Sequence, residues 1–78
     1  MGVIIDPDSP VYPYQQLAAN LRDRIAAGEI TGPLPSYTAL CADTGLSLGT
    51  VQRAVQLLVD EGLVIAVRGR GVFVRHDR

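Results

Sequence analysis

The spacing of apolar residues in the first half of the chain predicts a helix that begins at Pro13 and ends at Gly28. Proline suits the first turn of a helix, because the amide hydrogen that it lacks would have no partner there. Glycine often ends a helix, since it adopts the left-handed conformation easily. The apolar face of this helix consists of Tyr14, Leu17, Ala18, Leu21 and Ile25. Arg22 and Arg24, on either side of Asp23, are expected on the solvated face.

A short helix, a turn and a third helix are expected next. Ser36 is a suitable N-cap for the short helix, which ends near Thr44, and Gly45 supplies a turn with positive φ. Ser47 caps the third helix, and Gly62 ends it. The inward stripe of the third helix is Val51, Ala54, Val55 and Leu58.

Two β-rich runs follow, LVIAV at 63–67 and GVFV at 71–74, and the segment 68–71 joins them as a hairpin. This order of elements is that of a winged helix-turn-helix. The predicted fold class is therefore mainly α with a small β-hairpin wing, made of three helices plus two to three short strands. The predicted divisions are an N-terminal arm at 1–11, the domain at 12–75 and a frayed tail at 76–78.

Composition limits what a chain of 78 residues can do. One small core is all that it can bury, and 47% hydrophobic with 19% charged residues is typical of a folded domain. Its one cysteine, Cys41, is expected to be a small buried hydrophobic residue. No apolar run reaches membrane-spanning length and no secretory signal is present, so we expect a cytoplasmic protein with no membrane partner.

Candidate catalytic and metal-binding groups are lacking in the sequence. We find no nucleophile–base pair and no paired carboxylates, and His76 has no cysteine or carboxylate cluster at ligand spacing. We therefore expect no enzyme activity, no metal and no cofactor.

The charge is unevenly distributed. The formal net charge is −1, and all seven positive residues are arginines. Residues 1–49 hold two arginines against five acids, whereas residues 50–78 hold five arginines against three acids. The positive half is the one that carries the third helix and the hairpin, which is suggestive of nucleic-acid binding although the whole chain is not basic.

Three fragments of the sequence carry a family resemblance. YPYQQLAANLRDRIAAGEI covers 12–30, LPSYTALCADTGLSLGTVQRAVQLLVDEGLV covers 34–64, and VRGRGVFV covers 67–74. In this order they resemble the opening helix, the helix-turn-helix and the wing of the DNA-binding domain of GntR-family bacterial transcription regulators. The loop before Leu34 is about two residues shorter than the family pattern, which would clip the small strand that pairs with the wing.

The resemblance implies DNA contacts from the start of the second helix, the turn before the third, the third helix and the wing tip. The matching positions are Ser36, Tyr37, Thr38, Ser47, Leu48, Gly49, Thr50, Gln52, Arg53, Arg70 and Gly71. Family members usually have an acid and an arginine where this chain has Tyr37 and Thr38, and arginine where it has Leu48 and Gln52.

Each candidate contact has an ordinary structural alternative. Gln52 can bind adenine and Arg53 guanine, or both can be solvated helix-surface residues. Ser47 and Thr50 can donate to phosphates, and for Ser47 helix capping is an equal alternative. Arg70 between two glycines can reach a minor groove, or can be an exposed arginine of a tight turn.

Two functions follow from these observations. The first is a sequence-specific domain for double-stranded DNA in a bacterial transcription regulator, with helix 47–61 in the major groove and wing tip 68–71 in the minor groove. It is expected to work as a homodimer, with an effector ligand only if a C-terminal domain exists outside this chain. The alternative is a winged-helix protein-interaction or dimerisation module with weak or no DNA binding, which the missing arginines, the negative net charge and the apolar Leu48 at the reading edge favour.

Overall fold

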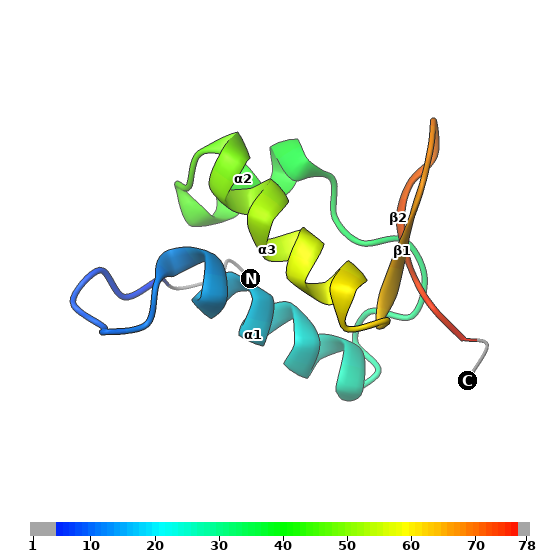
Figure 1. Cartoon of the computed structure of the whole chain (residues 1–78), viewed down its shortest axis with the longest axis horizontal. Helices are drawn as coiled ribbons and strands as arrows, with labels where there is room; N and C mark the ends of the chain where they lie inside the picture. The colour runs from blue at the N-terminus through cyan, green and yellow to red at the C-terminus, as the bar shows by residue number, and fades with distance from the viewer. Residues whose placement is uncertain (1–4, 77–78) are drawn as a thin grey trace.

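The computed structural model describes residues 5–76, in which three helices precede a two-stranded hairpin (Figure 1). The elements are α1 (Pro13–Ala26), α2 (Tyr37–Thr44), α3 (Leu48–Asp60), β1 (Val64–Val67) and β2 (Gly71–Val74). The predicted winged helix-turn-helix is confirmed. In Figure 1, α3 lies between α1 and α2, and the hairpin projects from the end of α3.

The helix boundaries follow the predicted signals. Pro13 occupies the first turn of α1, and Gly28, with φ of 79°, follows its C-terminal cap. The Ser36 hydroxyl accepts a hydrogen bond from the amide of Ala39 at 3.1 Å. Gly45 ends α2 with φ of 74°, as expected, and its amide donates to the carbonyl of Cys41.

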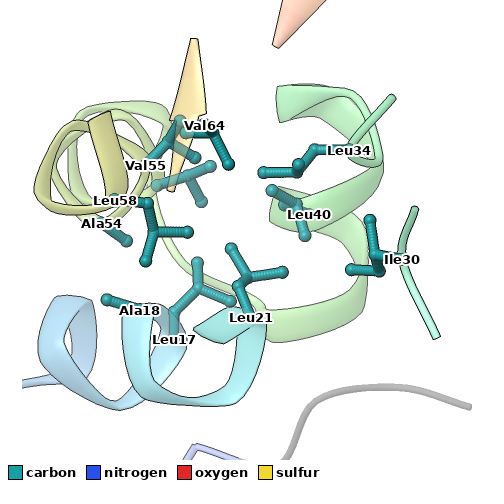
Figure 2. Close-up of a cluster of buried hydrophobic side chains, with 11 residues drawn as sticks. Leu17, Ala18, Leu21, Ile30, Leu34, Leu40, Ala54, Val55, Leu58 and Val64 are labelled. Atoms are coloured by element: carbon teal, nitrogen blue, oxygen red, sulfur yellow. The ribbon is translucent and has the colours of Figure 1, made fainter. Parts of the chain in front are cut away.

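The core lies where the three helices meet (Figure 2). Leu17 and Leu21 from α1 point toward Leu58 of α3 and Leu40 of α2, and all four are fully buried. Ile30 and Leu34 from the α1–α2 loop and Val64 from β1 close one side. Cys41 is only partly buried and packs against this cluster.

The wing is an antiparallel hairpin to which the α1–α2 loop adds a single bridge. Val64 pairs with Val74, and Val67 pairs with Gly71. Pro33 forms an isolated bridge with Phe73, supported by hydrogen bonds from the Leu34 amide to the Val72 carbonyl (2.8 Å) and from the Val74 amide to the Gly32 carbonyl (3.0 Å). The short loop therefore leaves one bridge in place of a third strand, as the predicted clipping implied.

Residues 5–11 of the predicted arm are tied to α1. The Gln16 side-chain amide accepts a hydrogen bond from the Asp6 backbone amide at 2.8 Å, and it donates to the backbone carbonyls of Asp6 and Val11. Ile5 packs against the core, whereas the two apolar residues before it, Val3 and Ile4, lie outside the described residues.

Arg22 was expected on the solvated face of α1, and its side chain is 39% exposed. Its guanidinium makes a two-pronged ion pair with Glu61, at 2.9 Å and 2.6 Å, which joins α1 to the C-terminal end of α3. The tail is not frayed at its first residue, since the His76 Nε2 hydrogen-bonds to the Thr31 carbonyl. Within residues 5–76, no helix has the length and apolar character needed to cross a membrane.

Candidate nucleic-acid interface

The N-terminal turn of α3 presents a neutral, exposed edge. The Ser47 hydroxyl accepts from the Thr50 amide at 3.3 Å and shares a 2.9 Å hydrogen bond with the Thr50 hydroxyl. This double contact holds both hydroxyls at the helix start, where free amides favour an anion such as a phosphate. Leu48 is 51% exposed, and Gly49 next to it has open space around its Cα.

Gln52 and Arg53 are both exposed on α3, but only Arg53 is held by a neighbouring element. The Arg53 guanidinium lies 4.3 Å from the centre of the Tyr14 ring, and Tyr14 stacks on Tyr12 with ring centres 6.1 Å apart. This cation–π contact between α1 and α3 restrains the guanidinium. Arg53 therefore sits beside α1 rather than projecting freely from α3.

A groove of about 390 Å³ opens beside this contact, between the start of α1 and the start of α3. It is lined by Tyr12, Pro13, Tyr14, Leu46, Thr50 and Arg53. Sequence reasoning placed Tyr14 on the apolar face of the first helix, and Tyr14 does pack against the core. It did not foresee the contact with Arg53, because no spacing signal links residues on different helices.

The wing tip is a tight turn that exposes two arginines. The Arg70 amide donates to the Val67 carbonyl at 3.0 Å, and positive φ is confined to Gly69 (77°) and Gly71 (117°). Positive φ at the third position of the turn is typical of type II geometry, which requires glycine there. Arg68 and Arg70 are both exposed at this turn.

A larger groove of about 520 Å³ separates this tip from the start of α2. Ser36 and Tyr37 lie on one wall, and residues 68–71 lie on the other. The structure thus brings four of the predicted contact residues to one groove: Ser36, Tyr37, Arg70 and Gly71. Thr50 and Arg53 share the smaller groove.

Most of the predicted contact residues are on the surface. Nine of the eleven predicted positions are exposed, and only Tyr37 and Thr50 are half-buried. None of the eleven is therefore excluded from contact with a ligand by burial in the core. Sequence reasoning did not single out Arg68, although it is exposed at the same turn as Arg70.

The acids of α3 and its C-terminal cap are at the opposite end of the helix from Ser47. Asp60 accepts a hydrogen bond from the Gln56 side-chain amide at 2.9 Å, and Glu61 is paired with Arg22. The hydrogen bond from Arg22 lowers the pKa of Glu61, and the same bond raises the pKa of Arg22. The N-terminal turn of α3 itself therefore carries no acid.

Comparison with known proteins agrees with this geometry. The family model for bacterial regulatory proteins of the gntR family matches residues 13–74. The HTH-type transcriptional repressor NagR of Bacillus subtilis (strain 168) is 39% identical over 72 residues, which cover 90% of this chain and 30% of NagR. The chain spans about a third or less of the length of NagR and of the other curated relatives first matched.

Solved structures share the whole fold. YtrA from Sulfolobus acidocaldarius, a GntR-family transcription factor, superposes with a TM-score of 0.87 at 32% identity, covering 100% of this chain and 84% of YtrA. The DNA-binding domain of AraR in complex with its operator ORX1 superposes with a TM-score of 0.82 at 26% identity, covering 96% and 99% of the two chains. This chain belongs to the gntR family of bacterial regulatory proteins, and it is a winged helix-turn-helix DNA-binding domain of a transcription regulator.

Proposed function

We propose that the domain binds a double-stranded operator with α3 in the major groove and the wing tip, residues 68–71, in the minor groove. The observation that carries the proposal is the wing tip, which projects from the helices (Figure 1) and has Arg68 and Arg70 exposed on a glycine-framed turn. Arginine in a narrow minor groove meets strong negative potential. The AraR domain, which has the same fold, is solved on operator DNA.

The eleven candidate residues divide by role in this proposal. Gln52 and Leu48 face base edges, whereas Ser47 and Thr50 face phosphates from the helix start. Ser36, Tyr37 and Thr38 lie at the start of α2, across the larger groove from Arg70 and Gly71, and contact the backbone between the two DNA grooves. Arg53 contributes at the rim, and Gly49 allows close approach of α3.

Dimeric binding follows from the small number of cations that each copy offers. Each phosphate neutralised by a side chain releases counterions, and one copy has only a few arginines to contribute. Two copies on a two-fold operator double this contribution. We infer a homodimer in the cytoplasm that acts by binding rather than catalysis. NagR, a repressor by name, supports repression through operator occupancy.

A protein-interaction module remains the second candidate, because four large apolar side chains of residues 5–76 are exposed. Val11 is 44% exposed, Tyr12 66%, Leu48 51% and Ile65 44%. Such residues are more typical of a protein contact than of a phosphate contact.

Titration of a duplex selected from a random pool, at two salt concentrations, separates the candidates. We expect Arg53→Ala and Arg70→Ala to weaken binding and Arg24→Ala, at the end of α1, to leave it unchanged. If no duplex binds even in low salt, or if neither of the first two variants matters, the DNA-binding proposal is wrong and the interaction module is favoured.

A further inference from the structure

The start of α3 carries an exposed leucine that the fold does not need. Leu48 is the first residue of the helix and is 51% exposed. It is not among the hydrophobic residues that pack against the core of the described chain. Its neighbour Leu46, by contrast, is partly buried and does pack there. The side chain of Leu48 is therefore free to contact a ligand.

The chain segment that contains this leucine is neutral. Residues 44–52, between Asp43 and Arg53, contain no charged side chain, and a side chain at Gly49 would meet no neighbour. An arginine or lysine here would reach a phosphate or a guanine. A leucine can do neither, so its contact must be with an apolar group.

The major groove offers one apolar group on its base edges, the C5-methyl of thymine. Guanine presents acceptors, and cytosine and adenine present amino donors. A leucine pressed on those edges would remove water from polar groups and provide no hydrogen bond in return, which is unfavourable. A leucine at this position therefore favours thymine for two reasons. It covers the methyl group of thymine, and it gives no hydrogen bond to the polar edges of the other bases.

Gln52 is exposed one turn further along α3. Leu48 and Gln52 are four residues apart, on one face of α3 and about 6 Å apart along its axis. That separation corresponds to roughly two base-pair steps of about 3.4 Å. Glutamine is suited to bidentate bonding with adenine. Both side chains thus favour A·T pairs close together.

We propose that Leu48 is a specificity-determining residue that selects a thymine in each operator half-site by contact with its C5-methyl group. The proposal rests on the proposed function, in which α3 enters the major groove. It adds a sequence preference that a position occupied by arginine would not have.

Replacement of single thymines by deoxyuridine tests this directly, because uracil pairs with adenine and lacks only the methyl group. The duplex is first selected from a random pool with the wild-type domain. Each half-site should contain one position at which a single deoxyuridine weakens binding about fourfold, the effect of one buried methyl group. The Leu48→Ala variant, whose exposed side chain is not needed for folding, should bind the thymine and uracil duplexes equally.

Two further variants sharpen the result. Ile65→Ala removes a similarly exposed aliphatic side chain (44% exposed) from the wing and should keep the methyl dependence. Leu48→Arg should select guanine at the position where the wild type selects thymine. Equal binding at every uracil substitution, persistence of the methyl effect in Leu48→Ala, or thymine retained by Leu48→Arg would each overturn the inference alone. Failure to select any duplex would overturn the proposed function itself.

Discussion

Arg53 shows how a contact between helices changes the role of one side chain. From the sequence it is an exposed arginine on the outer face of α3, available for a base. In the structure its guanidinium lies over Tyr14, which is itself stacked on Tyr12. The aromatic pair holds the guanidinium beside α1, and we propose that its target on DNA is a phosphate rather than a base edge.

The contact between Arg53 and Tyr14 should be measurable as a coupling energy. In a double-mutant cycle with Arg53→Ala and Tyr14→Leu, we expect the two changes to be coupled by about 0.5–1 kcal/mol, as for exposed cation–π pairs. Urea unfolding of the four proteins gives this value. The same cycle with Gln52→Ala in place of Arg53→Ala is the control, and a coupling of similar size there would show that the ring merely packs against α3.

Two glycines near the turn should respond oppositely to alanine. Gly45 has φ of 74°, so Gly45→Ala is expected to destabilise the fold by about 1–2 kcal/mol. Gly49 lies inside α3 without positive φ and without a neighbour within contact distance, so Gly49→Ala should stabilise by about 0.5 kcal/mol. Thermal unfolding tests both.

Gly49→Ala should also weaken binding to the selected duplex despite its greater stability, because it adds a methyl group to the surface proposed to face DNA. Stabilisation with unchanged binding would indicate that this turn of α3 does not approach the bases. Gly45→Ala thus tests a role in folding, whereas Gly49→Ala tests a role in binding.

At the scale of elements, the ion pair between Arg22 and Glu61 fastens α1 to the end of α3. It is two-pronged, which is the favourable geometry for arginine and a carboxylate. Both side chains are 39% exposed, however, so solvent screens the pair. Its contribution to the free energy of unfolding should be at the low end of the range for surface ion pairs.

The pair predicts a specific dependence of stability on pH. Because the pKa of Glu61 is lower in the folded than in the unfolded chain, its contribution is complete above the unfolded value near 4.3 and disappears as the pH falls through the lower folded value. Glu61→Gln should therefore cost about 0.5 kcal/mol at pH 7 and nothing at low pH.

Urea unfolding of wild type and Glu61→Gln at several pH values measures this difference. Asp60→Asn is the matched control, because Asp60 bonds only to Gln56 of its own helix among the contacts described. If the difference between wild type and Glu61→Gln is the same at pH 7 and at pH 3, the ion pair does not contribute as inferred.

At the scale of the whole molecule, a domain with net charge −1 binds a polyanion through an uneven surface. The acids at the end of α3 are bonded to Gln56 and Arg22, and the wing arginines Arg68 and Arg70 are exposed. Because each copy has so few cations, we propose that two copies bind together in a fixed relation.

Spacing between half-sites tests this arrangement. Insertion of about five base pairs, half a turn of DNA, should place the two copies on opposite faces of the duplex and weaken binding of the second copy. Insertion of about ten base pairs should return both copies to the same face and restore the affinity. Gel-shift titration reports the two binding steps. Equal affinity at all spacings would mean that the copies bind independently.

Most of the fold could be predicted from the sequence, and the site only in part. The helices, the positive φ at Gly45 and the hairpin over 64–74 depend on local signals: apolar periodicity, capping hydroxyls and glycine. The eleven candidate contacts came from a family resemblance. Their exposure is compatible with the structure, but their roles stay predictions.

The sequence by itself determined which segments are helical, which faces are apolar and where each element ends, because these depend on residues within about one turn of each other. Only the tertiary structure decided which distant residues meet. It paired Arg22 with Glu61, placed Arg53 on Tyr14, reduced the third strand to the bridge at Pro33, and left Leu48 exposed. The physical reason is that such contacts depend on how the helices pack around the core, and neighbouring sequence positions carry no record of that packing.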